Sequence, residues 1–249
     1  MASSPTDRAE SEADWLSAKA AELGPVNIVQ PTKLQQVAAA RLAETWRTVP
    51  HVTHYDLADI TDLEAARKAW NTAQAARLSL IPSVIKATVT ALQAYPSFNA
   101  SLLPNGKILL KDYFNIGVIV DVGDGLLIPV IRNCDQKSIV EIADELSNVV
   151  VRAKTKGLGF SEMDGGCFTI SSLGGVAGTH FTPIINAPEA AILGISRSFS
   201  VPSTDSSHPR IKLPLSLSYD HRINNGVTAG GFLGTIASEL NNGGRVMTI

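Results

Sequence analysis

The hydrophobic period of this chain changes near residue 100, and no other feature limits its fold as strongly. Before that point apolar residues recur at helical spacing, interrupted by one β-forming stretch at 51–60. After it come short apolar runs bounded by turn residues. Helices and strands without strict alternation predict an α+β fold built on a mixed sheet.

Local signals mark the helix starts in the first third. Residues Thr32–Gln35 and Thr61–Glu64 each have the spacing of a capping box, in which side chains satisfy free backbone N–H groups at the helix start. Pro50 ends the first helix, and Pro82 suits the first turn of a third. One face of the first helix carries Leu34, Val37, Ala38, Leu42 and Trp46.

The rest of the chain predicts strands, a long helix capped by Ser138 and a final helix over 227–240. The turn Gly123–Gly125 joins two of the strands into a hairpin. The expected strands cover 107–113, 116–122, 126–132, 167–172, 190–196 and 211–219.

We divide the chain into an N-terminal arm or linker, residues 1–30, and one core domain, residues 31–249. A domain of this length can bury a sizeable core. Trp15 leaves two interpretations of the arm open: docking on a neighbour, or a loose terminus. Residues 1–14 have neither the apolar core of a signal peptide nor the arginine bias of a transit peptide.

Composition excludes several function classes. A formal net charge of -2 argues against a nucleic-acid surface. No apolar run approaches the ~18–20 residues that span a bilayer, so we expect no membrane partner. The two cysteines, Cys134 and Cys167, are too far apart for a zinc site or a disulfide framework. No cluster of residues has metal-ligand spacing, and we therefore expect no metal.

His221 is the first candidate for chemistry. It follows the apolar strand Ile211–Leu217 and precedes Asn225-Gly226, a turn or helix start. A histidine ring held at a strand end can be aimed at a substrate, and an unperturbed histidine suits general base catalysis at neutral pH. The alternative is a core or surface histidine, a role that we assign to His51, His54, His180 and His208.

Ser171, Ser172 and Asn225 are the other candidates. The two serines end an apolar strand and precede Gly174-Gly175, so a hydroxyl there can approach a substrate as a nucleophile or an oxyanion donor. Ordinary strand-end hydrogen bonding is the structural alternative. Asn225 can hold a loop or donate a hydrogen bond, or it can serve as a helix N-cap.

These motifs together resemble the catalytic domain of the dihydrolipoamide acyltransferases of 2-oxoacid dehydrogenase complexes, which share the chloramphenicol acetyltransferase fold. Residues Asp220–Gly226 resemble the family signature DHRxxxG. The resemblance covers roughly residues 30–249. The segments that are similar to the family's strands and loops are Pro50–Thr53, Ala58–Thr61, Asp124–Arg132, Phe168–Gly175 and Thr182–Glu189.

The resemblance implies a mechanism. His221 would act as general base on the thiol of coenzyme A, and the thiolate would attack the acetyl thioester of a lipoyl group carried on a separate domain. Ser171 would donate a hydrogen bond to the oxyanion and would form no acyl-enzyme. The family usually has aspartate at the position of Asn225, which leaves the role of Asn225 open. Residues 186–189 are most similar to the pyruvate dehydrogenase type.

The resemblance also implies an assembly. The active site would lie between subunits of a homotrimer, with His221 from one subunit and Ser171 from the next. Trimers would build a larger cage through the apolar tail Val246, Met247 and Ile249. The implied partners are a lipoyl domain, a decarboxylase component and dihydrolipoamide dehydrogenase, in the cytoplasm of a bacterium rather than the mitochondrial matrix. The lipoyl and subunit-binding domains are absent from this sequence, which therefore resembles a core domain with part of its linker.

Three other functions stay open. One is a catalytically silent core scaffold. Another is the acyltransferase of a different 2-oxoacid or acetoin dehydrogenase complex. The third is a free-standing antibiotic acetyltransferase, from which the wider motifs point away.

Overall fold

The computed structural model describes residues 5–74, 77–176, 178–203 and 209–243. His208 and the apolar tail Val246, Met247 and Ile249 lie outside these residues.

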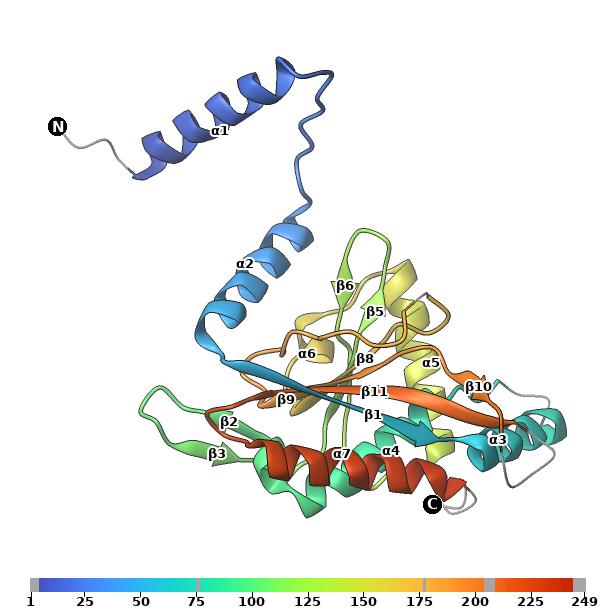
Figure 1. Cartoon of the computed structure of the whole chain (residues 1–249). Helices are drawn as coiled ribbons and strands as arrows, with labels where there is room; N and C mark the ends of the chain where they lie inside the picture. The colour runs from blue at the N-terminus through green and yellow to red at the C-terminus, as the bar shows by residue number, and fades with distance from the viewer. Residues whose placement is uncertain (1–4, 75–76, 177, 204–208, 244–249) are drawn as a thin grey trace.

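A mixed sheet forms the centre of the molecule (Figure 1). Its strand order is β1-β11-β9-β8-β4-β7, and β10 pairs with β11. Strand β8 runs parallel to β4 and β9, whereas the other pairs in this sheet are antiparallel. The predicted mixed sheet is confirmed. Its strands are β1 (His51–Asp59), β4 (Ile116–Val118), β7 (Val130–Ile131), β8 (Phe168–Ser172), β9 (Ala191–Ile195), β10 (Phe199–Val201) and β11 (Arg210–Asp220).

Two short hairpins project from this sheet. Strands β5 (Val120–Asp121) and β6 (Leu126–Leu127) form the predicted hairpin, with Val122 N donating to Gly125 O at 3.0 Å. Strands β2 (Ala100–Leu102) and β3 (Ile108–Leu110) form the other. The strand predicted over 107–113 is therefore shorter than expected, and its partner β2 has no sequence prediction.

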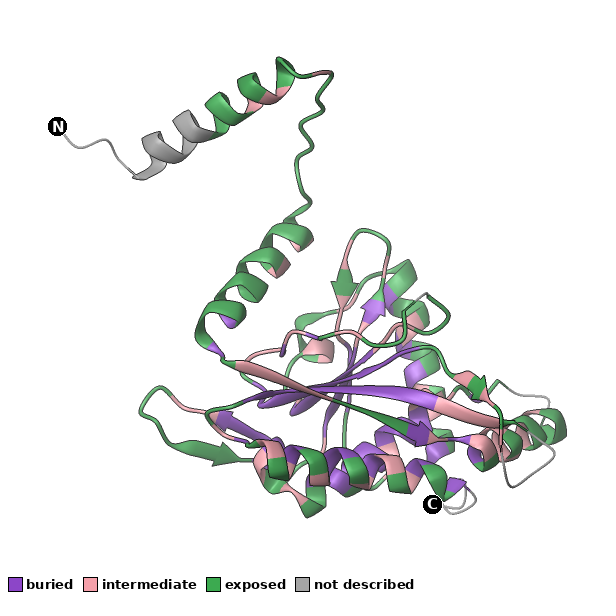
Figure 2. Ribbon diagram, viewed as in Figure 1, coloured by how far each residue is buried: buried purple, intermediate pink, exposed green. Residues whose placement is uncertain are grey.

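Helices α4 (Ile81–Ala94), α5 (Ile139–Thr155) and α7 (Gly226–Asn241) cover one face of the sheet and bury the core against it (Figures 1 and 2). The opposite face carries polar side chains such as Thr169, Ser216 and Ser218, which alternate with core residues along their strands. The segment 173–190 covers part of that second face, where Phe181 packs on Gly194.

The helix starts predicted at Thr32, Thr61 and Ser138 are confirmed, and two of the three predicted caps form. Ser138 forms a capping box with Glu141 at the start of α5, and Thr32 forms one with Gln35 at the start of α2 (Lys33–Thr48). Helix α3 (Thr61–Gln74) begins where predicted, but the capping box predicted for Thr61–Glu64 does not form, because Glu64 N donates to Ile60 O. The Thr61 hydroxyl donates to Asp59 Oδ1 at 2.6 Å and accepts from Ile211 N at 2.9 Å.

The N-terminal part extends away from the sheet (Figure 1). Helix α1 (Pro5–Ala21) lies inside the stretch interpreted as an arm, and Trp15 on it is 65% exposed. The apolar face of α2 is also largely uncovered, since Leu42 is 44% and Trp46 62% exposed. Two short helices complete the fold: η1 (Pro96–Phe98) and α6 (Phe160–Met163).

Candidate active site

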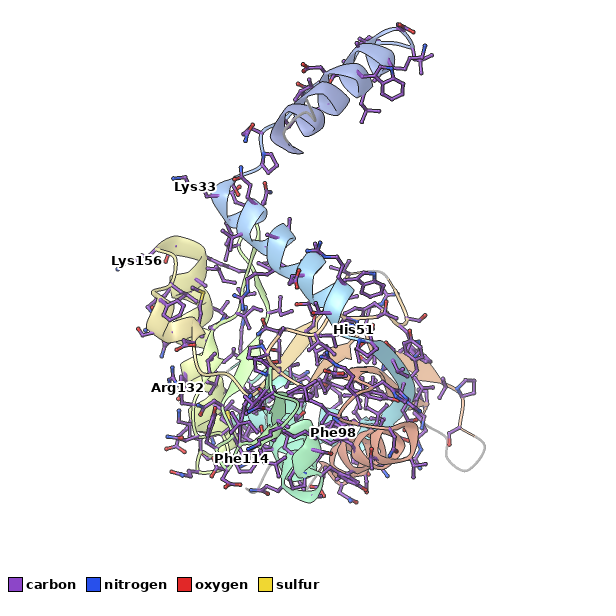
Figure 3. The ribbon with its side chains drawn as sticks, turned by 90° about the vertical axis from the view of Figure 1, so that its left-hand side faces the viewer. Lys33, His51, Phe98, Phe114, Arg132 and Lys156 are labelled. Carbon is purple, nitrogen blue, oxygen red and sulfur yellow. The ribbon has the colours of Figure 1, made fainter. Side chains whose placement is uncertain are left out.

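The backbone at the end of β11 fixes the place of His221. Asp220 N donates to Ala190 O at 2.9 Å, and His221 N donates to Pro50 O at 3.0 Å. Pro50 immediately precedes β1, where α2 runs down to His51 (Figure 3). The His221 side chain is exposed in the turn that follows the strand. The structure therefore confirms the predicted strand-end position.

An ion pair closes the turn that carries His221. The buried Asp220 carboxylate accepts from Arg222 N at 3.0 Å, from Nε at 2.9 Å and from Nη2 at 2.6 Å. These bonds raise the pKa of the Arg222 guanidinium, because they favour its charged form. The turn is further anchored at Asn224, whose side chain bonds both the hydroxyl and the carbonyl of Ser97. Asp220 and Arg222 thus hold the turn through bonds that do not use the His221 ring.

Asn225 is the N-cap of α7. Its Oδ1 accepts from Val227 N at 3.0 Å and from Thr228 N at 3.1 Å. The capping interpretation of this residue is confirmed. Within the described part of the chain, no hydrogen bond joins Asn225 to the His221 ring.

Ser171 and Ser172 differ in what their hydroxyls do. Ser172 Oγ accepts from Gly174 N at 3.2 Å and so stabilises the turn after β8. Ser171 is buried, with 9% of its surface exposed, and its hydroxyl bonds to none of the described residues. Only Ser171 therefore has a hydroxyl available for a ligand.

Ser171 and His221 do not meet within one chain. Ser171 pairs with Gly194 of β9, and Gly194 pairs with Ser216 of β11. His221 lies five positions beyond Ser216, which corresponds to roughly 16 Å along the strand and 10 Å across two strand spacings. Strand β11 is antiparallel to β9, whereas β8 is parallel to β9. The carboxyl ends of β8 and β11 therefore lie at opposite edges of the sheet, with Ser171 near one and His221 just past the other. A site that uses both needs two copies of the chain.

Glu189 is a buried carboxyl that sequence reasoning missed. Its Oε1 accepts from Thr169 Oγ1 at 2.9 Å and from Asn186 Nδ2 at 3.1 Å. Burial raises the pKa of Glu189 to about 7, while these hydrogen bonds and the charge of Lys111 oppose that rise. Burial of Lys111 lowers the pKa of its ammonium group. A glutamate placed directly before the apolar run Ala190–Ile195 was the sequence signal.

A pocket of about 410 Å³ opens beside Ser172. Its walls come from α5, from the segment before α4 and from β4 and β5. Two cationic side chains, Arg77 and Lys154, lie at this pocket together with the hydroxyls of Ser79 and Ser147. The combination of apolar walls and cations suits a long ligand with an anionic end.

His51 and the two cysteines have structural environments. His51 Nδ1 donates to Val49 O at 2.8 Å, and its Nε2 accepts from Ile185 N at 3.0 Å. Burial raises the pKa of the Cys134 thiol to about 12 and that of Cys167 to about 11, so neither forms a ready thiolate. The described residues contain no cluster of metal-ligating side chains and no helix long and apolar enough to cross a membrane.

Comparison with known families gives one match over most of the chain. The model for the 2-oxoacid dehydrogenases acyltransferase (catalytic domain) matches residues 24–248. Acetyltransferase components of the pyruvate dehydrogenase complex from Azotobacter vinelandii and Pseudomonas aeruginosa are each 47% identical over 88% of this chain. The chain spans 36% and 42% of the length of these two relatives.

Solved structures give the same picture. The chain matches dihydrolipoamide acetyltransferase from Azotobacter vinelandii with a TM-score of 0.87 and 45% identity, covering 91% of this chain and 96% of that one. That work concerns the catalytic roles of a serine, a histidine and an asparagine, with the asparagine four positions after the histidine. The cubic core of a pyruvate dehydrogenase multienzyme complex matches equally well, with a TM-score of 0.87. Chloramphenicol acetyltransferase, at 12% identity and a TM-score of 0.53, shares the fold alone.

Proposed function

Because this chain belongs to the acyltransferase family of the 2-oxoacid dehydrogenases, we propose that it transfers an acetyl group between a dihydrolipoyl group and coenzyme A. One observation carries the proposal. The chain has a free serine hydroxyl at Ser171 and a histidine at 221, followed after four positions by Asn225. The same three residue types, with the same interval from histidine to asparagine, are the subject of the work on the similar Azotobacter enzyme.

His221 acts as the general base in this proposal. Its exposed ring takes the proton from the thiol of coenzyme A, and the thiolate attacks the carbonyl carbon of the acetyl thioester. The tetrahedral intermediate collapses by breaking the bond to the dihydrolipoyl sulfur, which takes up the proton that the imidazolium received from coenzyme A. Since one ring accepts the proton from the first sulfur and donates it to the second, the reaction needs no further acid. A positioned base of this kind contributes typically 10²–10⁴-fold in rate.

Ser171 stabilises the oxyanion of that intermediate. Its hydroxyl bonds to none of the described residues, so it can donate to the developing charge without first breaking a bond. A donor in a buried site is preorganised and works in a low dielectric. No acyl-serine is involved in this proposal, because the thiolate of coenzyme A attacks the acetyl carbonyl directly.

The proposal includes a homotrimer. Two facts support it: the sheet separates Ser171 from His221, and α2 exposes an apolar face with Leu42 and Trp46. Exposed apolar surface of this kind marks contact with another chain. The similar structure of a cubic core supports assembly of trimers into a larger cage.

The pocket beside Ser172 is the proposed entry of coenzyme A. Arg77 and Lys154 supply positive charge for the phosphates, and the apolar wall from Val118 to Val120 suits the pantetheine arm. The pocket reaches the end of β8, where the thiol has to arrive.

The further components complete the proposal. A lipoyl domain would bring the acetyl group, the decarboxylase component would load it, and dihydrolipoamide dehydrogenase would reoxidise the lipoyl group. A bacterial cytoplasmic location is supported by the bacterial origin of the relatives.

Acetyl transfer between acetyl-coenzyme A and free dihydrolipoamide tests the function. We expect activity from the wild-type chain, a loss of about 10²–10⁴-fold in His221→Ala and a loss of about 10²–10³-fold in Ser171→Ala. Ser200→Ala is the matched control, since Ser200 is exposed on β10 and does not line the pocket. A folded, oligomeric wild type with no transfer would show that the chain is a silent scaffold.

A further inference from the structure

The ring of His221 lacks the support that a catalytic histidine usually receives from a hydrogen-bonded neighbour. Asn225, four positions later, uses its side-chain oxygen to cap α7. Asp220 uses its carboxylate on Arg222. Among the described residues, no hydrogen bond reaches the His221 imidazole, so its orientation depends on packing.

The packing partner is Tyr219. Tyr219 is the penultimate residue of β11, and His221 follows the end of that strand. The ring centroids are 5.9 Å apart and the planes differ by 28°. This is the range of stacked aromatic pairs. The exposed His221 ring therefore rests on a buried ring.

Tyr219 is itself held on two sides. It is completely buried, and its ring stacks on His54 of β1 with centroids 5.7 Å apart and 27° between the planes. Phe98 meets it edge-on at 6.1 Å. Figure 3 shows Phe98 among the side chains packed around the core. Because the interior is close-packed, Tyr219 forms a fixed base for the ring above it.

The Tyr219 hydroxyl takes no visible part in this support. It is buried and bonds to none of the described residues, and burial raises its pKa, which keeps it neutral. The support therefore comes from the face of the ring, which a phenylalanine would preserve.

We propose that Tyr219, backed by His54, is a positioning residue that holds the His221 imidazole in the orientation needed for proton transfer. This inference rests on the proposed function only where activity is the measurement. A misplaced base costs catalysis more than binding, because substrate contacts elsewhere are unchanged.

Three variants in acetyl transfer separate positioning from stability. Tyr219→Leu should lower kcat by about 10- to 100-fold with the KM values of both substrates within about twofold. Tyr219→Phe should keep at least about a third of the wild-type kcat. Phe232→Leu is the control, because Phe232 is equally buried in the same aromatic cluster but contacts Phe98 and Phe168 rather than Tyr219. A Tyr219→Leu enzyme with unchanged kcat, or a kcat loss shared by Phe232→Leu, would overturn the inference.

A spectroscopic measurement does not depend on activity. In the wild-type chain with labelled histidine, stacking should shift the His221 ring-proton resonances upfield and give contacts to Tyr219 ring protons. Tyr219→Phe should preserve the shift. If the wild type lacks both signals, the positioning role fails even when acetyl transfer is present. If the signals are present and transfer is absent, the proposed function fails and the stack stands.

Discussion

At the scale of single residues, the most unusual group is the Glu189 carboxyl. It is buried beside Thr169 and Asn186, and its pKa is raised to about 7 from an ordinary value of 4.5. The folded chain therefore binds more protons at this site than the unfolded chain between those two pH values. The stability that this group contributes is fully present below pH 4.5 and is lost as the pH rises through about 7.

This loss predicts that the unfolding free energy of the wild type depends on pH differently from that of Glu189→Gln. From pH 4.5 to pH 7.5 the wild-type unfolding free energy should fall relative to the variant, by about 3 kcal/mol at most. Denaturant titrations at several pH values measure it. Glu141→Gln is the control of opposite sign, because bonds from Ser138 lower the pKa of Glu141 and its contribution fades as the pH falls. Parallel profiles for wild type and Glu189→Gln would contradict the assignment.

The cations of the pocket give a second residue-scale prediction. Replacing Arg77 and Lys154 by glutamine should raise the KM for coenzyme A several-fold, because phosphate charges lose their partners. The KM for dihydrolipoamide should stay unchanged in steady-state kinetics. Lys156→Gln provides a comparison, as Lys156 lies just past the end of α5 and does not line the pocket. Equal effects on both KM values would exclude the pocket as a selective coenzyme A site.

Sequence reasoning at this scale identified candidates better than roles. His221 was predicted from its place after a strand, and the structure confirms that place. The residue pattern alone did not distinguish Ser171 from Ser172, and only the family resemblance selected Ser171, since the difference is a hydrogen bond from Gly174 that depends on the turn. Glu189 was missed because burial of a carboxyl depends on residues distant in sequence, such as Lys111.

At the scale of elements, the start of α7 combines stability and site geometry. Asn225 caps two backbone N–H groups there, so Asn225→Ala should lower the unfolding free energy by about 1 kcal/mol. Asn225→Asp should keep the stability, because aspartate caps equally well. Asn242→Ala, at the other end of α7, is a control and should change the unfolding free energy by less than about 0.5 kcal/mol.

Denaturant unfolding measures all three variants. An Asn225→Ala chain as stable as the wild type would show that the cap is unimportant. If instead Asn225→Asp is as stable as the wild type but slower in acetyl transfer, the amide has a role beyond capping.

Helices and strands were largely predictable because their signals are local. The caps at Thr32 and Ser138 form as their spacing predicts. Thr61 does not, because the nearby Asp59 carboxylate and the distant Ile211 N–H both engage its hydroxyl. Helix α1 was missed since it has no apolar stripe, although its alanines and charged residues favour helix.

At the scale of the whole molecule, the apolar face of α2 is an exposed surface that we propose to contact another subunit. Leu42→Glu should leave the fold of the single chain intact, because that side chain is 44% exposed. We expect the variant to have a lower mass than the wild type by light scattering, since a charge would be buried in the subunit contact. Ala43→Glu is the control, as the next helical position points about 100° away. Unchanged mass in Leu42→Glu would show that α2 does not join subunits.

The oligomeric assembly was predicted only from the resemblance to a known family. Periodicity and caps act within one chain, whereas a shared site depends on surfaces of two. The structure adds a physical reason for a shared site, because the sheet register keeps Ser171 and His221 at opposite ends. The sequence does not reveal this separation, because it depends on how the strands pair in the folded sheet.

Mixing two inactive variants tests whether two subunits share one active site. His221→Ala and Ser171→Ala are produced together in equal amounts, and acetyl transfer by the mixed oligomers is compared with that of each variant alone. If the site combines His221 of one subunit with Ser171 of the next, random mixing should restore about one quarter of the wild-type activity, since half of the subunits supply each intact residue. Activity no higher than that of the separate variants would contradict a site shared between subunits.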